Sequence, residues 1–303
     1  MVNRWLVILW VVLLLFSCRN RPDSSFDESA SGTDTTVISL GPSEISGEAM
    51  EEIIHNIASP VEIAALVNEL GVPFSRKYLS STSSTDNLET NFKQAYKLGI
   101  YGADLGYLNI YNKTSSAVDY LSTIKSLADE INVGQFFDFQ TMKRLAISGN
   151  ELDSLLFLSV RSFNQMDQYL RENNRSNLST LIVSGLWIEG LYLATQIAQE
   201  HPYPEITERI GEQKIVLNDL LLLLNFYRND QKFAELIQDL ESIKAEFEEV
   251  TITYEIGEPE TVEEDGMLVI IQNEHSIVDI KDQQLNNITR KVEEIRNKTI
   301  NQI

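Results

Sequence analysis

Residues 176–200 read SNLSTLIVSGLWIEGLYLATQIAQE, and this stretch decides how the rest of the chain must fold. Glu189 is the only charged residue between Arg175 and Glu200. A helix that is apolar on nearly every side belongs in the middle of a domain, because no face of it is suited to water. The stretch therefore predicts a central helix that other helices surround.

Helical periodicity continues on both sides of this stretch, with apolar residues three and four positions apart. The connections are short, as at residues 172–175 and 201–203. Long helices joined by tight links must fold back as antiparallel neighbours. The other helices are expected over residues 86–111, 116–132, 138–147, 150–172, 204–228 and 231–249. An earlier helix begins at the capping box Ser59-Pro60-Val61-Glu62 and ends at Gly71.

The period of the apolar residues changes from 3.6 to 2 near residue 250, which indicates strands. Residues 250–256 alternate in this way and predict a half-buried strand, with which 267–271 and 276–280 are expected to pair as a small antiparallel sheet. A final helix from about Asp282 has an apolar face and should dock on the other helices. That face consists of Leu285, Ile288, Val292 and Ile295.

These patterns predict one mainly all-α domain over residues 47–303. The fold class is an antiparallel multi-helix bundle with a small C-terminal β-hairpin or sheet element at about 250–280 and a final docked helix.

The N-terminal stretch has the pattern of a targeting signal. Arg4 is followed by the unbroken apolar run 5–16. The run is shorter than the roughly 20 residues that a membrane-spanning helix needs, and it is typical of a secretory signal. Leu15-Phe16-Ser17-Cys18 resembles the lipobox of bacterial lipoproteins, in which the cysteine thiol is diacylated and the cysteine becomes the new N-terminus. The resemblance predicts that residues 1–17 are a signal peptide and that Cys18 is lipidated.

Residues 18–46 are rich in Ser, Thr, Asp and Gly and predict a flexible linker between the lipid and the domain. We expect the protein to lie in the cell envelope, at the outer membrane, and to contact the membrane through acyl chains such as palmitate on Cys18. Cys18 is the only cysteine, so lipidation leaves no thiol for a disulfide, a nucleophile or a metal site.

The chain is strongly acidic. Its formal net charge is −21, and the charge becomes −22 when Arg4 leaves with residues 1–17. Such a surface repels the phosphates of nucleic acids and the head groups of anionic lipids. The three histidines are scattered and indicate neither a metal site nor a serine triad. We therefore expect no nucleic-acid partner, no metal and no cofactor.

Three charged residues stand alone in otherwise apolar helical segments: Asp104, Arg161 and Glu189. An unpaired buried carboxylate costs several kcal/mol or takes up a proton. The planar fork of Arg161 is suited to bond one or both acids, which would give a structural ion pair that fixes how the helices dock. Two alternatives stay open. The three residues could form the polar floor of a ligand pocket, or Glu189 with a raised pKa and an ionised Asp104 could perform acid–base catalysis.

Glycines accompany both acids. Gly99, Gly102 and Gly106 are three and four residues apart, and Gly185 and Gly190 flank Trp187. Each glycine costs about 1 kcal/mol in a helix interior relative to alanine. Close approach of a second helix would offset that cost, so we expect these helices to pack tightly. The alternative is a groove in which a ligand lies against bare backbone.

Three stretches resemble an uncharacterised family of helical lipoproteins from Bacteroidota: Ser59–Glu62, Gly99–Leu105 and Gly185–Tyr192. The resemblance covers most of the helical domain. It implies no established activity and therefore no catalytic residue.

The favoured interpretation is a non-enzymatic role, in which the domain binds or scaffolds a protein partner in the cell envelope. One alternative is a hydrolase or lyase that uses the carboxyl groups of Glu189 and Asp104, with Arg161 holding an anionic group. The other alternative is a small-ligand carrier with an interhelical pocket.

Overall fold

A computed structural model describes residues 66–82, 90–148, 152–257, 260–264, 267–271 and 274–302. All of them belong to one compact unit, Leu40–Ile303. The predicted signal peptide 1–17, Cys18, the linker 18–46 and the capping box at 59–62 lie outside the described residues.

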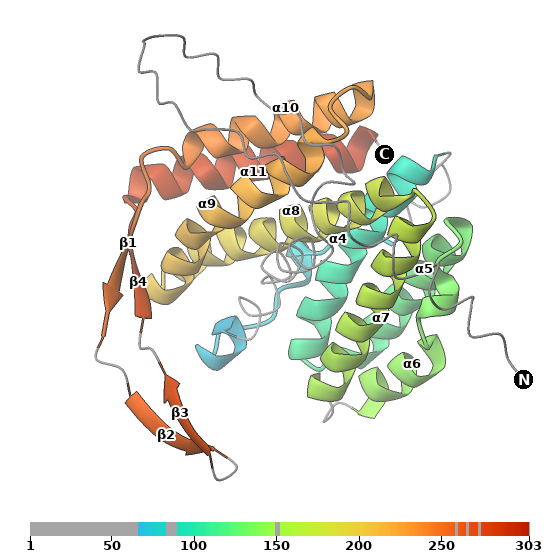
Figure 1. The fold of residues 1–303 in the computed structure, drawn as a ribbon, viewed down its shortest axis with the longest axis horizontal. Coiled ribbons are helices and arrows are strands. Elements are labelled where there is room, and N and C mark those ends of the chain that lie inside the picture. The colour runs from blue at the N-terminus through green and yellow to red at the C-terminus, as the bar shows by residue number, and fades with distance from the viewer. Residues whose placement is uncertain are drawn as a thin grey trace, which may run out of the picture. The chain divides into compact units, whose positions relative to one another are not determined.

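The described chain is a bundle of helices followed by strands and one final helix, as the sequence predicts (Figure 1). The elements before the strands are η2 (Arg76–Tyr78), α4 (Asn91–Ile110), α5 (Thr114–Glu130), η3 (Gly134–Phe136), α6 (Phe139–Ser148), α7 (Leu152–Glu172), α8 (Ser176–Glu200), α9 (Pro204–Asn225) and α10 (Gln231–Glu246). The strands are β1 (Thr251–Ile256), β2 (Glu260–Glu264), β3 (Met267–Ile271) and β4 (Glu274–Asp279), and α11 spans Asp282–Gln302. Each helix predicted between residues 86 and 249 is present, with ends shifted by a few residues.

The helix α8 is central, as its sequence predicts. It packs against α4, α7, α9 and α11, and nearly all of its side chains from Leu178 to Ala198 are buried. By length and composition α8 is the one helix in the described part of the chain that could cross a membrane, but the neighbouring helices bury most of it. Burial inside the domain accounts for its apolar composition.

Four helical segments end in the same way, which explains the short links between them. The residues with positive φ are Gly71 (71°), Asn112 (52°), Asn132 (57°) and Asn174 (56°). The residue after each donates back into the helix, as when Lys113 N donates to Leu108 O at 2.9 Å. This is the Schellman closure, in which a left-handed glycine or asparagine ends a helix. The prediction that a helix ends at Gly71 is confirmed.

The β region consists of separate two-stranded ladders, and this corrects one detail of the prediction. β1 pairs with β4 and β2 pairs with β3, both antiparallel. The sequence did not predict β2, because glutamate is uncommon in strands and β2 reads Glu-Thr-Val-Glu-Glu. A signal was present, since Asp265-Gly266 between β2 and β3 in the sequence is the dipeptide typical of tight hairpins.

The β1–β4 ladder docks on α9. Ile252 lies opposite Val278 in the ladder, and both are half-buried. Gly211 of α9 makes room for the ladder, since a Cβ there would lie 2.3 Å from Val278 Cγ1. Tyr254, two residues further along the same face, is 60 % exposed. Only the beginning of β1 is therefore half-buried as predicted.

The final helix, α11, docks on the bundle against α8 and α10. Its apolar face is the predicted one, with Ile288, Val292 and Ile295 buried and Leu285 half-buried. The same face brings Arg296 into the core, where it is 8 % exposed. The docking of α11 therefore places a charged group inside the domain.

Candidate functional site

The candidate site begins where α4 crosses α8. A Cβ at Gly99 would lie 1.9 Å from Ile182 O of α8, and a Cβ at Gly185 would lie 2.0 Å from Tyr96 O of α4. No side chain fits at either position, so the two glycines let the helix backbones touch. The predicted close approach is confirmed for Gly99 and Gly185.

Beyond this crossing, Asp104 of α4 and Glu189 of α8 lie in one buried cluster with Arg296 of α11. Neither carboxyl side chain has exposed surface. We call Tyr78, Ser80, Asp104, Glu189 and Arg296 the buried polar cluster. Its members come from four parts of the chain that are far apart in sequence.

Arg296 is the cationic centre of the cluster. Its Nε donates to Glu189 Oε2 at 2.9 Å, and its Nη2 donates to Glu189 Oε1 at 2.6 Å. Such two-pronged bonds are the strongest that arginine and a carboxylate form. The guanidinium carbon also lies 4.2 Å from the centre of the Tyr192 ring. Burial lowers the pKa of Arg296, but the hydrogen bonds and charge of Glu189 outweigh burial, so this pKa is raised.

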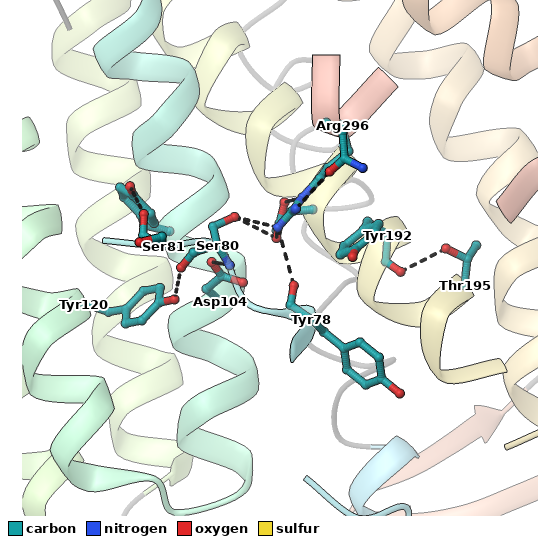
Figure 2. Close-up of polar contacts among 11 residues, drawn as sticks. Tyr78, Ser80, Ser81, Asp104, Tyr120, Tyr192, Thr195 and Arg296 are labelled. Carbon is teal, nitrogen blue, oxygen red and sulfur yellow. Dashed lines mark hydrogen bonds and ion pairs between the residues drawn. The ribbon is translucent and has the colours of Figure 1, made fainter. Parts of the chain in front are cut away.

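A short segment before α4 completes the cluster, and Figure 2 shows Arg296 pointing toward it. The Ser80 hydroxyl donates to Glu189 Oε1 at 3.1 Å and accepts from Arg296 Nη2 at 2.7 Å. The Tyr78 carbonyl accepts from Arg296 Nη2 at 3.4 Å. The Ser80 carbonyl accepts from the Tyr120 hydroxyl of α5. The cluster thus joins this segment to α5, α8 and α11.

Asp104 is the least satisfied member of the cluster. Its Oδ2 accepts from Ser80 N at 3.1 Å, whereas its Oδ1 has no hydrogen-bond partner among the described residues. Burial raises the pKa of Asp104 well above its ordinary value, and the charge of Glu189 raises it further, against the opposing effect of Arg296. Burial therefore favours the neutral acid, whereas the catalytic alternative assumed an ionised Asp104.

The structure does not bring Arg161 to the two acids. Arg161 is exposed on α7. The guanidinium group that bonds Glu189 belongs to Arg296, whereas the sequence predicted that it belongs to Arg161. The isolation of Arg161 in the sequence was misleading, because the helical face decides burial. On α7 the buried face runs through Leu155, Ser162 and Met166, and Arg161 lies beside it.

Sequence reasoning missed Arg296, although a signal for it exists. Arg296 follows Val292 by four residues and Ile288 by eight, which is the spacing of the buried face of α11. A charge on an apolar face indicates a buried partner. The neighbouring Glu293 and Glu294 obscured that signal, since they suggest a solvated surface.

A second buried cation, Lys97, also escaped the sequence analysis. Lys97 is 1 % exposed and lies four residues before Tyr101 and seven before Asp104, on one face of α4. Its Nζ lies 5.6 Å from the centre of the Tyr101 ring, and burial lowers the pKa of Lys97. α4 therefore presents a lysine, a tyrosine and an aspartic acid in a row to the interior.

The geometry of the cluster suits it to fixing helices. A substrate would have to displace the segment at Ser80 to reach either carboxyl group, because the acids have no exposed surface. A buried pair of this kind is costly to break once formed. In the described ranges, no three side chains of His, Cys, Asp or Glu are arranged to hold a metal ion.

An open cleft lies at the beginning of the same two helices. Its volume is about 880 Å³, and it is lined by the first turns of α4, α8 and α10 together with residues just before them. None of the buried polar cluster lines it. The cleft is therefore a second candidate site, separate from the predicted one.

The fold and the cluster define the class of the protein as a mainly α-helical domain held together around a buried arginine–carboxylate pair. Comparisons with known protein families, with curated proteins and with solved structures found no match. Function must therefore be inferred from the residues and their geometry.

Proposed function

We propose that the protein is a lipid-anchored component of the cell envelope whose helical domain binds or scaffolds a partner and catalyses no reaction. The anchor is the acylated Cys18 in the outer membrane, and residues 18–46 are its tether. The lipobox-like Leu15-Phe16-Ser17-Cys18 supports the anchor, and the resemblance to helical lipoproteins of Bacteroidota supports the setting. The acidic charge of the chain disfavours nucleic acid as a partner.

One observation carries the choice of binding over catalysis: Arg296 bonds both carboxylate oxygens of Glu189 inside the domain. A catalytic acid or base must reach the proton it transfers within hydrogen-bond distance. The carboxylate oxygens of Glu189 accept hydrogen bonds from Arg296 and from Ser80. Glu189 is therefore better placed to hold helices together than to contact a substrate. We therefore give the buried polar cluster a structural role and expect the binding function to lie on the surface of the domain.

The hydrolase or lyase alternative is disfavoured by the same contacts. It would need Ser80 to move away and the bonds between Glu189 and Arg296 to open, at a cost of several kcal/mol. The ligand-carrier alternative has an observation in its favour, because the open cleft is present beside α4 and α8.

Crosslinking in intact cells of the producing organism tests the binding role. The tagged full-length protein is captured after crosslinking, and its neighbours are identified by mass spectrometry. The control is an unrelated domain fused to residues 1–46, which shares the anchor and the tether. We expect an envelope protein to be captured reproducibly with the full-length protein and not with the control. Recovery of the same proteins from both samples would contradict a partner specific to this domain.

Replacing the anchor residue tests the location. We expect Cys18→Ser to stay unprocessed at residues 1–17 and to lose acylation, because the predicted processing requires the lipidated thiol. Cell fractionation with metabolic labelling by a fatty acid measures both effects. A Cys18→Ser protein that matures normally and stays on the membrane would remove the lipoprotein assignment.

A further inference from the structure

We infer that the free edge of β3 pairs antiparallel with β3 of a second copy of this chain, so that two copies share a four-stranded sheet. The free edge is the side of β3 that does not face β2. In the part of the chain that the structure describes, β3 pairs with β2 alone. The inference goes beyond the proposed function, because it concerns contact between two copies at a surface apart from the buried polar cluster and the cleft.

The β2–β3 hairpin lacks the packing that a two-stranded ladder normally requires. Among the described elements, β2 and β3 contact each other, and neither has more than marginal contact with a helix or with the β1–β4 ladder (Figure 1). A hairpin of two strands is at best marginally stable in water by itself, and independent stability takes three or more strands or packing against a helix. A strand added at the free edge of β3 would therefore stabilise the hairpin as well as join two molecules.

Charge distinguishes the two edges of this hairpin. β3 reads Met-Leu-Val-Ile-Ile and contains no charged residue, whereas Glu260, Glu263 and Glu264 occupy three of the five positions of β2. Proteins commonly protect an exposed edge strand with charged residues, which disfavour pairing with another chain. The edge of β2 has that protection and the edge of β3 does not. β3 is therefore the edge of the hairpin at which another strand can pair.

The charge of the whole chain makes β3 a place where two copies can approach each other. The formal net charge is −21, so the acidic surfaces of two copies repel each other. Antiparallel pairing centred on Val269 would set Val269 opposite its own copy, Leu268 opposite Ile270, and Met267 opposite Ile271. Every pair is then apolar, and cross-strand pairs of this kind stabilise neighbouring strands. The sequence of β3 is thus complementary to itself and avoids the repulsion.

The glutamates of β2 stay well apart in such a dimer. The strand order would be β2, β3, β3 and β2, with the two copies of β2 at the outer edges. Neighbouring strands are about 4.8 Å apart, so three spacings separate the copies of β2 by about 14 Å. This distance exceeds the Debye length of about 8 Å at physiological ionic strength, so the repulsion between them is screened. A twofold contact uses the free edges of both copies of β3 and leaves acidic edges outside, so assembly ends at the dimer.

Sedimentation equilibrium of the purified full-length protein tests the inference. The protein is measured in pentaethylene glycol octyl ether, a detergent whose density is close to that of the buffer, and we expect a concentration-dependent dimer. Val269→Lys would set two lysines opposite each other. It should raise the dissociation constant of the dimer at least about tenfold, since like charges directly opposite each other destabilise a strand pair. Ile277→Lys, the same substitution at an exposed residue of β4, is the matched control and should keep the dimer.

Single cysteines test the register, and they keep the inference testable if Val269→Lys weakens the hairpin itself. In Val269→Cys the two cysteines would form the central pair, whose Cα atoms lie about 4.5–5.5 Å apart in antiparallel strands, within the range of a disulfide. In Val262→Cys, on β2 opposite Val269, they would lie about 14 Å apart, too far for a disulfide. We expect oxidised glutathione to crosslink Val269→Cys and to leave Val262→Cys and the wild type uncrosslinked.

Three results would overturn the inference: a monomer at about 100 µM, where micromolar association is nearly complete; a dimer that Val269→Lys and Ile277→Lys weaken equally; or disulfide dimers of Val262→Cys and not of Val269→Cys. A different occupant of the edge has its own outcome. If the purified protein is a monomer and Val269→Lys abolishes the capture of an envelope protein in cells, the edge of β3 binds that protein and not a second copy. The proposed function would stand in that case, whereas the pairing of two copies would be disproved.

Discussion

The helices α4 and α8 pass through two different regions of the molecule. In the middle, their backbones touch at Gly99 and Gly185, and nearly all polar groups around Asp104 and Glu189 bond to one another. At the beginning, the same helices border an open cleft, in which Asn91 is exposed and Asn177 is half-buried. One pair of helices therefore supplies both a closed region and an open one.

The difference indicates which residues control the stability of the domain. Buried charges with internal partners are costly to separate, so the closed region should control the free energy of unfolding. Exposed side chains contribute little to stability, so substitutions in the open region should hardly change the free energy of unfolding. Substitutions in the middle of the helices test this division.

Breaking the ion pair should have the largest effect. In Glu189→Gln, Arg296 stays buried with only a neutral partner in place of the carboxylate. We expect a loss of about 3–5 kcal/mol in the free energy of unfolding, as for other buried pairs that lose one member. Chemical denaturation measures the loss. Glu293→Gln, on the exposed side of α11, is the matched control for the change of charge.

A double variant sharpens the same test. Glu189→Gln combined with Arg296→Gln removes both charges, so no unpaired ion is left in the core. Its loss should be smaller than the sum of the two single losses, because neighbouring residues of a pair are coupled. Additive losses, or a Glu189→Gln variant as stable as Glu293→Gln, would contradict a structural ion pair.

Adding one methyl group at the helix crossing should have the next largest effect. In Gly99→Ala the new Cβ would lie 1.9 Å from Ile182 O, so α4 and α8 must separate. We expect a loss of about 3 kcal/mol, at the upper end for overpacked cores. Gly106→Ala is the control in the same helix, because a Cβ there meets nothing within 4 Å. It should be neutral or add up to about 1 kcal/mol of stability, as alanine favours helices. Equal stability of the two variants would disprove the close crossing.

Local patterns were sufficient to predict the helices and the close crossing. The apolar periodicity of residues 176–200 predicts a buried α8, and the spacing of Gly99 from its neighbouring glycines predicts tight packing. Both features depend on residues that are close together in one helix, so a single sequence is enough to predict them.

The partners within the cluster could not be predicted in the same way. The bond between Arg296 and Glu189 joins residues 107 positions apart. Arg296 rather than Arg161 is the partner of Glu189 because of the way α11 docks. Ser80 contacts the acids through its backbone N–H as well as through its hydroxyl. A backbone N–H is present in almost every residue, so the sequence gives no sign of this contact. The cleft is formed by three helix ends that only the tertiary fold brings together.

The two acids of the closed region should differ in their response to pH. The pKa of Asp104 is raised by burial, so the folded protein keeps this proton at pH values where the unfolded chain, with a pKa of about 3.9, has lost it. Folding then takes up a proton, and this contribution to stability falls as pH rises from about 4 toward the raised pKa.

Asp104→Asn removes this titration while keeping the shape of the neutral acid. We expect the stability difference, wild type minus variant, to fall as the pH rises above about 4, by at most about 1.4 kcal/mol per pH unit. Denaturation curves at several pH values measure this difference. Asp119→Asn, at an exposed acid of α5, should give a difference that stays constant with pH. Parallel curves for wild type and Asp104→Asn would show that Asp104 is ionised in the folded protein.

The smallest effect is expected at Arg161, and it separates the predicted cluster from the observed one. Arg161 is exposed on α7 and Arg296 is buried against Glu189, so two arginines of the same chemistry occupy opposite environments. Arg161→Gln should change the free energy of unfolding by no more than about 0.5 kcal/mol, as surface substitutions usually do. Arg296→Gln should cost several kcal/mol, because it leaves Glu189 buried without its cation. Thermal and chemical denaturation of the two variants, made by the same substitution, compare them directly. A large loss for Arg161→Gln with little loss for Arg296→Gln would restore Arg161 as the partner of the acids and would contradict the docking of α11.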